Sequence, residues 1–232
     1  MNTFKHYSFD LWMTLIKSNP SFKKERALFF YEHFNKKNKS IEEVERVFMQ
    51  VDRMCNSINE QTGNNIDAEE MYLMVITIMN DYSIDFQNPD ITKLYDEMEE
   101  LTLKYLPIIY CPETIKVLNT LKQSGDSTFS ILSNTAFIKG KTLRKVLDKI
   151  ELGSFFDFQL YSDELGLSKP NKKLFDVMLT TITDNRKGKQ IDLKEIIHIG
   201  DNAKADIHGA NIAGIHSLLI NSNNMSILNL LN

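Results

Sequence analysis

Five polar or charged residues, far apart in the sequence, each close or follow a short apolar segment of the kind that forms a buried strand. They are Asp10, Ser133, Asn134, Lys169 and Asp201. In an open α/β sheet, ligands bind beyond the carboxyl ends of the strands, so these side chains would converge on one edge if such a sheet forms. Each alone has an ordinary explanation as a turn or capping residue. Their coincidence on one edge predicts a functional site.

Two carboxylates, an ammonium and a hydroxyl at one edge could perform nucleophilic hydrolysis. Asp10 would attack a phosphoryl group or a carbon and form a covalent aspartyl intermediate that water then hydrolyses. Attack on a phosphate dianion brings like charges together, at a cost of about 4 kcal/mol for unit charges about 4 Å apart at an effective dielectric near 20. Cations are therefore needed, and Lys169 supplies one. Ser133 can donate its hydroxyl to a phosphoryl oxygen, with backbone amides after Asp10 and Asn134 adding to the cradle.

The elements that must position these residues fall into three stretches. Residues 4–10 alternate apolar and polar side chains, as a strand does. From about 21 to 106, apolar residues recur at three- and four-residue spacings, which predicts a bundle of four helices with little or no sheet. From about 108 onward, helical segments alternate with short apolar strands, which is typical of a parallel sheet with crossover helices.

This order predicts an α/β protein with a doubly wound, mostly parallel, Rossmann-like sheet core and an inserted α-helical bundle cap. We expect the core to comprise residues 1–16 and 108–232, and the cap residues 17–107. The later strands are predicted at 129–134, 156–161, 195–201 and 215–220, and the later helices at 114–123, 139–150, 171–182 and 203–213. The active site would lie where core and cap meet, closing over small substrates.

Composition excludes several classes of protein. Lys and Arg number 27 against 31 Asp and Glu, so the formal charge of −4 provides no general attraction to nucleic acid or anionic lipid. No stretch approaches the roughly 20 apolar residues that span a bilayer, and the N-terminus lacks the apolar run of a signal peptide. Two cysteines are too few for a disulfide framework. We expect a cytoplasmic protein whose partner is a small-molecule substrate, with no nucleic acid or membrane partner; the sequence leaves the oligomeric state unknown.

The same residues resemble the motifs of the haloacid dehalogenase-like hydrolase superfamily, over essentially the whole chain. The matching segments, in the correct order and spacing, are FDLWMTL at 9–15, ILSN at 131–134, the Lys-Pro of GLSKPNKKLF at 166–175, and IGDNAKAD at 199–206. The helical insertion after the first strand also resembles the α-helical cap of one subfamily. The resemblance implies catalytic roles for Asp10, Ser133 and Lys169, with Ser133, Asn134, Lys169 and Trp12 contacting the substrate.

The resemblance further implies a Mg²⁺ cofactor. Asp10, Asp201 and the backbone carbonyl of Trp12 would hold the ion, because hard carboxylate and carbonyl oxygens suit it. Asp206, one helical turn beyond Asp201, would orient the metal or its water shell. An ordinary carboxylate in a first helical turn is the alternative interpretation of Asp206, since the helix dipole favours acids there.

Trp12 departs from the pattern of the superfamily's phosphatases, which usually carry an acid two residues after the nucleophile. An indole can neither protonate a leaving alkoxide nor deprotonate water, a function worth about 10²- to 10⁴-fold in rate. Three explanations are open. The substrate has a good leaving group, such as an acyl phosphate or a halide; the protein binds phosphorylated ligands with weak turnover; or a cap side chain takes the role, the candidates being Glu25, Arg26, His33 and Asp52.

Metal-free carbon–halogen hydrolysis is the main alternative, because the dehalogenases of the superfamily tolerate an aromatic residue at position 12. The segment IGDNAKAD favours phosphoryl chemistry, since it keeps the acidic metal-binding arrangement. Without a cation, Asp201 and Asp10 would raise each other's pKa and suppress the nucleophile. Trp12 is interpreted either as packing between core and cap or as an apolar wall facing the leaving group. We predict a magnesium-dependent hydrolase that acts on a small phosphorylated metabolite through an aspartyl-phosphate.

Overall fold

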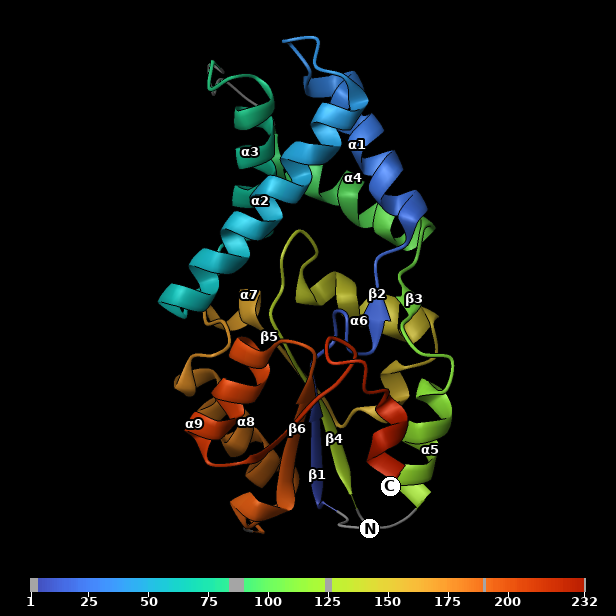
Figure 1. The fold of residues 1–232 in the computed structure, drawn as a ribbon, viewed down its shortest axis with the longest axis vertical. Helices are drawn as coiled ribbons and strands as arrows, with labels where there is room; N and C mark the ends of the chain where they lie inside the picture. Colours follow the sequence, from blue (N-terminus) through green and yellow to red (C-terminus); the bar gives the residue numbers. More distant parts are fainter. Residues whose placement is uncertain (1–3, 84–89, 124–126, 190, 232) are drawn as a thin grey trace.

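A parallel five-stranded sheet forms the centre of the molecule (Figure 1). The computed structural model describes residues 4–83, 90–123, 127–189 and 191–231. The strand order is β5-β4-β1-β6-β7, and every neighbouring pair is parallel. The strands are β1 His6–Phe9, β4 Thr128–Ser133, β5 Phe158–Tyr161, β6 Ile196–Gly200 and β7 His216–Leu219. Because β1 lies in the middle and the chain continues outward on both sides of it, ligands are expected beyond its carboxyl end.

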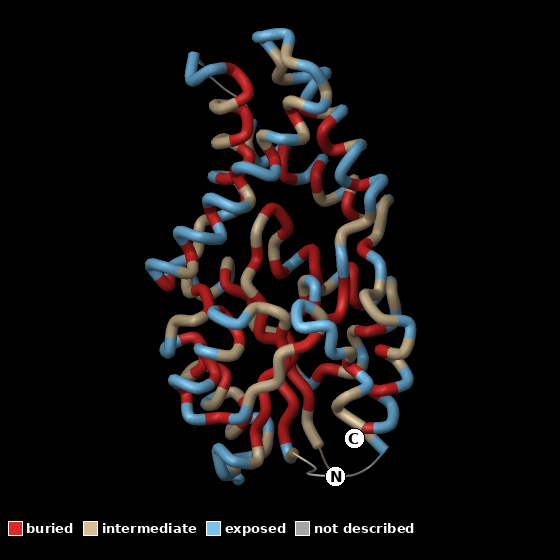
Figure 2. Tube along the Cα trace, viewed as in Figure 1, coloured by how far each residue is buried: buried red, intermediate tan, exposed pale blue. Residues whose placement is uncertain are grey.

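Helices cover both faces of the sheet, which confirms the predicted doubly wound α/β core. Tyr7 and Phe9 of β1 project into an apolar cluster shared with α5 (Thr114–Gln123) and α6 (Gly140–Lys149). The opposite face packs on α8 (Lys172–Asn185) and α9 (Gly209–Ala213). Figure 2 shows the buried residues concentrated along the strands. The core also contains the short helix α7 (Ser162–Leu165) and a π-helical turn (Ala203–His208). Short 3-10 turns lie at Gly153–Phe155, Leu193–Glu195 and Ile227–Leu231.

Four helices stand above the carboxyl end of the sheet as a cap (Figure 1). They are α1 Pro20–Phe34, α2 Ile41–Thr62, α3 Ala68–Met79 and α4 Ile91–Lys104. The cap has its own apolar cluster, separate from those of the core, into which Phe30, Phe48 and Tyr72 pack. None of the helices in the described ranges combines the length and the hydropathy that crossing a bilayer needs.

A short antiparallel ribbon lies where the chain leaves the core for the cap and where it returns. Its strands are β2 (Ile16–Lys17) and β3 (Ile108–Ile109), with Ile16 opposite Ile109. Sequence patterns did not predict it, because two residues are too few to show a period. We propose that this ribbon is the boundary between the core, residues 1–16 and 108–232, and the cap, residues 17–107.

The polar residues of β1 lie on a buried face, which the alternation of residues 4–10 alone does not reveal. His6 and Ser8 are fully buried, and each bonds to a neighbouring strand. The His6 ring Nε2 lies 2.8 Å from the Ser130 hydroxyl, and the Ser8 hydroxyl lies 2.8 Å from Nδ1 of His198. Central strands of parallel sheets are covered on both faces, so polar side chains there must bond to one another.

We predict that Phe30→Ala lowers the free energy of unfolding by about 3–5 kcal/mol, because the ring is fully buried and leaves a cavity. Its ring centroid lies 4.9 Å from that of Phe48 and 5.7 Å from that of Tyr72. Urea unfolding followed by circular dichroism provides the measurement. Tyr31→Ala, whose side chain is 42% exposed, is the control and should change stability by only about 0.5 kcal/mol. Equal losses in the two variants would contradict the cap packing described here.

Candidate active site

The predicted site residues meet at the carboxyl edge of the sheet. Asp10 follows β1, Ser133 ends β4 and Asp201 follows β6, so three adjacent strands deliver three side chains to one place. The Asp10 amide donates to the Ile199 carbonyl at 2.8 Å, which continues the pairing of β1 with β6 to the nucleophile position. Asp10 Oδ1 accepts hydrogen bonds from the Ser133 hydroxyl at 3.0 Å and from the Lys169 ammonium at 2.8 Å.

Lys169 is a buried cation, only 1% exposed, between two carboxylates. Its Nζ lies 2.8 Å from Asp10 Oδ1 and 2.6 Å from Asp206 Oδ1. Burial alone would lower the pKa of Lys169, but the charges of Asp10 and Asp206 outweigh it and raise that pKa. The ammonium therefore stays protonated at the point where a transferred phosphoryl group would need positive charge.

Asn134 holds the backbone of Lys169. Its side-chain oxygen accepts from the Lys169 amide at 2.7 Å, and its Nδ2 donates to the Lys169 carbonyl at 3.1 Å. Because both ends of the amide side chain bond to one residue, Asn134 positions the loop that carries Lys169. The direct contact of Asn134 with a substrate, expected from the sequence, stays a prediction.

Asp206 is anchored from three sides. Oδ1 contacts Lys169 and, at 3.1 Å, Nε2 of His198, while Oδ2 accepts from the Asn202 amide at 2.9 Å. Burial by itself would raise the pKa of Asp206, but Lys169 and His198 together hold it well below its usual range. The carboxylate packs so closely on Gly200 that a Cβ there would lie 2.1 Å from Asp206 Cγ. These bonds favour a role in fixing Lys169 over direct metal ligation.

Thr14 is a site residue to which sequence reasoning assigned no role. Its buried hydroxyl lies 3.1 Å from Asp10 Oδ2 and 3.2 Å from Asp201 Oδ1, so it can donate to either carboxylate. The available signal was its position four residues after Asp10 in the first motif. That spacing becomes informative only once a turn after β1 brings Thr14 back to the strand end.

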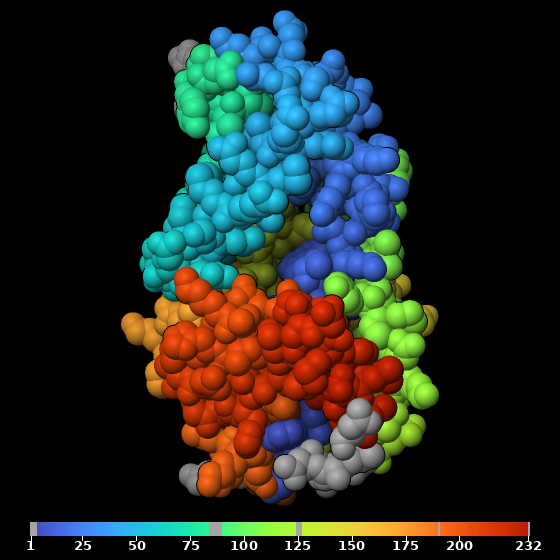
Figure 3. Space-filling view, viewed as in Figure 1, coloured from blue at the N-terminus to red at the C-terminus, as the bar shows by residue number. Residues whose placement is uncertain are grey.

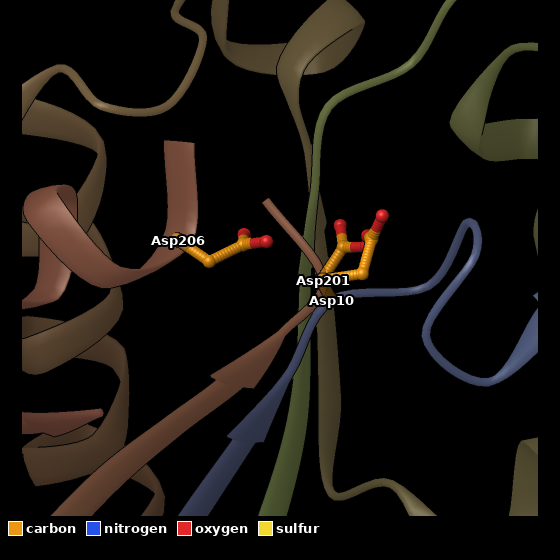
Figure 4. Close-up of side chains that lie close together, drawn as sticks. All are labelled: Asp10, Asp201 and Asp206. Atoms are coloured by element: carbon orange, nitrogen blue, oxygen red, sulfur yellow. The ribbon is translucent and has the colours of Figure 1, made fainter. Parts of the chain in front are cut away.

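The three acids lie in one cluster (Figure 4), in which Asp10 and Asp201 could hold a divalent cation while Asp206 contacts Lys169. One oxygen each from Asp10, Asp201 and Asp206 lie within 4.8 Å of one another. Burial, followed by the charges of Asp10 and Asp206, raises the pKa of Asp201 to about 7. Burial also raises the pKa of Asp10, with Lys169 offsetting part of the effect. Oxygen donors crowded in this way are the ligands that Mg²⁺ prefers.

The Trp12 carbonyl is the third oxygen donor that the sequence motifs imply for the metal. Within the described part of the chain, it accepts none of the loop backbone hydrogen bonds, because the turn is closed by the Met13 amide donating to Ile16 and the Ile16 amide donating to Leu11. Asp10, Asp201 and this carbonyl are the groups that could hold Mg²⁺.

A cavity of about 580 Å³ lies between the core and the cap. Figure 3 shows the hollow between the blue and cyan cap helices and the orange and red core. The core lines it with the acids and Lys169, and the cap with α1 and α2. Of the four cap side chains considered for acid or base chemistry, Arg26 and Asp52 line the cavity. Glu25 and His33 are not among its lining residues, and His33 Nδ1 bonds to the Phe29 carbonyl at 2.8 Å instead.

Trp12 meets both interpretations that its position allowed. The side chain is half-buried, packs against the apolar cluster of the core and also lines the cavity. Its indole is thus an apolar part of the cavity wall, two residues after Asp10. The structure places no carboxylate of the first loop there, since the residues after Asp10 are Leu11, Trp12 and Met13.

A doubly wound core, a carboxylate cluster at the carboxyl edge of its sheet and a helical cap above it together define the class of capped α/β hydrolases. The chain belongs to the haloacid dehalogenase-like hydrolase family, whose model matches residues 7–220. This membership confirms the resemblance found in the sequence motifs.

Two curated relatives and one solved structure illustrate the similarity. Pyrimidine 5'-nucleotidase YjjG of Escherichia coli is 30% identical over 111 residues, which are 48% of this chain and 44% of that protein. A glyceraldehyde 3-phosphate phosphatase of Methanothermobacter thermautotrophicus is 33% identical over 113 residues, again 48% and 44% of the two chains. The putative HAD-hydrolase YfnB from Bacillus subtilis, bound to magnesium, has a TM-score of 0.67 at 18% identity and covers 94% of this chain and 87% of that one.

The matched region is less than two thirds of the length of these curated relatives. The structural similarity, at 18% identity, concerns the fold. Substrate and activity are therefore inferred from the site.

We predict that Asp206→Ala lowers the free energy of unfolding by about 3–5 kcal/mol, because it leaves Lys169 and His198 buried with a missing partner. Urea unfolding in the presence of EDTA provides the measurement, so that bound metal contributes nothing. The control is Asp176→Ala, which breaks the exposed pair with Lys172 and should cost less than about 1 kcal/mol. A loss below 1 kcal/mol for Asp206→Ala would show that the buried pair does not hold the site together.

Proposed function

We propose that the protein is a magnesium-dependent phosphatase that acts on a small phosphorylated metabolite through an aspartyl-phosphate on Asp10. The observation that carries the proposal is the carboxylate cluster at Asp10 with Lys169 beside it, both facing a cavity of about 580 Å³. Two relatives that share about a third of their aligned residues with this chain are named as a nucleotidase and a phosphatase, which supports the same chemistry.

Asp10 would attack phosphorus with one carboxylate oxygen. The bond from phosphorus to the leaving oxygen breaks as the new bond forms, and the electron pair departs with the leaving group. Lys169 and Ser133, both within 3.0 Å of Asp10 Oδ1, lie where they can bond to the phosphoryl oxygens. Water then attacks phosphorus as the bond from phosphorus to the Asp10 oxygen breaks. The protons of water leave with inorganic phosphate, and the Asp10 carboxylate is regenerated.

Bound Mg²⁺, held by Asp10, Asp201 and the Trp12 carbonyl, would supply positive charge beside the transferred phosphoryl group. Asp206 would keep the Lys169 ammonium aimed at the same place, through their 2.6 Å contact. Thr14 would restrain the orientation of the two carboxylates, because its hydroxyl can donate to Asp10 Oδ2 or to Asp201 Oδ1.

The acidic cluster weighs against metal-free carbon–halogen hydrolysis. Three carboxylates face one ammonium among the groups of the cluster, and the pKa of Asp201 is raised to about 7. A metal-free mechanism with Asp10 as nucleophile would be hindered by the neighbouring charges of Asp201 and Asp206. Binding of phosphorylated ligands with weak turnover is the other alternative, and Trp12 is the residue that favours it.

We predict that Asp10→Asn lowers the rate of phosphate release by about 10⁴-fold or more, because an amide cannot act as the nucleophile. A panel of phosphoesters, acyl phosphates and 2-haloacids is assayed with magnesium and with EDTA, measuring phosphate and halide. EDTA should abolish phosphate release, and Asp176→Asn, which changes an exposed acid, should retain it. Halide release that resists EDTA would establish the dehalogenase instead, and no release of either product would favour a binding protein.

Trp12 restricts the leaving group, since no acid follows Asp10 in the first loop. Asp52 of α2 lines the cavity, whereas Glu25, the other carboxyl considered in the cap, does not. Burial raises the pKa of Asp52, and the charges of Arg26 and Lys23 offset part of that effect. A raised pKa suits an acid, but Asp52 lies on the cap and not beside the nucleophile in the loop. We therefore propose that aryl and acyl phosphates, whose leaving groups need no proton, react faster than alkyl phosphates.

We predict that Trp12→Asp raises the rate on an alkyl phosphate such as glycerol 3-phosphate by about 10²- to 10⁴-fold, because it restores a carboxyl group beside the leaving oxygen. The rate on acetyl phosphate should change little. Steady-state phosphate release from both substrates is measured for the wild type, Trp12→Asp and Asp52→Asn. A selective loss of alkyl phosphate activity in Asp52→Asn, with no gain in Trp12→Asp, would show that Asp52 already supplies the proton.

A further inference from the structure

Arg26 is a buried cation in the cap that the proposed reaction does not use. It lies on α1, is only 9% exposed, and belongs to the lining of the cavity that also contains Asp10 and Lys169. Long charged side chains are almost never buried to this degree unless they are paired. The burial of Arg26 at the cavity wall therefore needs an explanation.

Aromatic rings surround the guanidinium. Its Cζ lies 4.1 Å from the ring centroid of Phe48, 4.7 Å from that of Phe137 and 5.2 Å from that of Phe22. Phe48 and Phe22 belong to the cap, whereas Phe137 comes from the core loop after β4. Arg26 is thus held at the junction of the two parts. Aromatic rings at these distances stabilise a cation by cation–π attraction and restrain its orientation. They do not accept the hydrogen bonds that the guanidinium donates in its own plane.

Arg26 forms no direct ion pair with a described carboxylate, although the charge of Asp52 acts on it from farther away. Within the described residues, none lies within 4.0 Å of the guanidinium, and its Nε has no hydrogen-bond partner. Burial lowers the pKa of Arg26, and the nearby Tyr72 hydroxyl and Asp52 carboxyl offset only part of that effect. A guanidinium always carries its charge in proteins, so the unpaired donor is a standing cost to the fold.

Packing alone does not account for the residue. Replacing a buried charged group with an apolar side chain of similar volume is often neutral or stabilising, so a position that only filled space between three phenylalanines would be better served by Met or Leu. An anion bound in the cavity would supply the missing partner. The planar edge of a guanidinium matches the two oxygens of a carboxylate or phosphate in a bidentate pair.

We propose that Arg26 binds a second oxyanion of the substrate, a carboxylate or a second phosphoryl group, at the cap side of the cavity. The substrate class is then a small metabolite with a phosphoryl group at Asp10 and another anionic group at Arg26. This inference rests on the proposed function for the first group and on Arg26 alone for the second. The cavity volume of about 580 Å³ is within the range of small-molecule sites.

The test compares ligands that differ in one group. Glycerol 3-phosphate and 3-phosphoglycerate have the same length and phosphoryl group, but the second carries a carboxylate in place of a hydroxymethyl; glycerol 1,3-bisphosphate carries a second phosphoryl group. Dissociation constants are measured by calorimetry with magnesium on the Asp10→Asn protein, which cannot turn them over. We expect at least one of the two ligands with a second anionic group to bind about tenfold to a hundredfold more tightly than glycerol 3-phosphate. The ligand with the larger preference identifies the group.

Variants test whether Arg26 causes the preference for a second anionic group. In the Asp10→Asn protein, the additional substitution Arg26→Gln should remove that preference. Lys24→Gln, which changes an exposed cation of the same cavity lining, should leave it unchanged. Arg26→Lys keeps the charge without the planar fork and should narrow the preference, which also provides a test if Arg26→Gln fails to fold. Equal binding of the three ligands, no binding of any, or a preference that survives Arg26→Gln would overturn the inference.

A separate assay distinguishes failure of the role of Arg26 from failure of the proposed phosphatase activity. Hydrolysis of p-nitrophenyl phosphate, which has no second anionic group, by the wild-type protein tests the phosphatase alone. Turnover without a preference for ligands that carry a second anionic group would leave the phosphatase and reject the role of Arg26. A preference lost in Arg26→Gln, without any turnover, would leave the binding site and reject the phosphatase.

Discussion

The ammonium of Lys169, buried between Asp10 and Asp206, is the interaction on which the site depends. A charge with 1% exposure is tolerable only when partners replace the water it has lost, and here two carboxylates do so at 2.8 and 2.6 Å. The second partner is itself fixed by His198 and by the Asn202 amide. A chain of hydrogen bonds therefore runs from His198, on the buried face of the sheet, through Asp206 and Lys169 to Asp10. It fixes the position of the Lys169 ammonium before any substrate binds.

The same site carries more negative than positive charge. Asp201 lies within 4.8 Å of the other two acids, and its pKa is raised to about 7. Thr14 can satisfy one carboxylate at a time because a hydroxyl has one proton. A divalent cation at Asp10 and Asp201, as proposed for the phosphatase, would balance this negative charge. Phosphoryl transfer uses such a cation, whereas displacement of halide by Asp10 has no need of the acids.

The cap and the core contribute different parts of the cavity. The core supplies groups that would act on phosphorus, and the cap supplies Arg26 and Asp52, which we propose face the rest of the substrate. Contacts across the junction, including the ion pair of Lys139 with Glu69 and the 2.7 Å bond from Asn202 to Glu60, hold the cap over the site. A reaction common to a family can thereby be combined with a recognition surface particular to one chain.

The order of the five sheet strands and of the longer helices, and the set Asp10, Ser133, Lys169 and Asp201, could be predicted from the sequence alone. Periodicity is a local property, and the carboxyl end of a parallel strand is a place that pattern and topology define together. The π-helical turn at Ala203–His208 lies within the segment 203–213 that was expected to be one helix, because a helical period does not distinguish the two.

The tertiary structure decided which side chains touch. It brought Thr14 to two carboxylates, turned Asn134 toward the Lys169 backbone, and placed Arg26 and Asp52, but not Glu25 or His33, at the cavity. These four cap residues are equivalent in a sequence, since each is a polar position on a helix. Which of them line the cavity depends on how the cap helices pack against the core, for example against the loop of Phe137, more than a hundred residues after Arg26. No local sequence pattern encodes that packing.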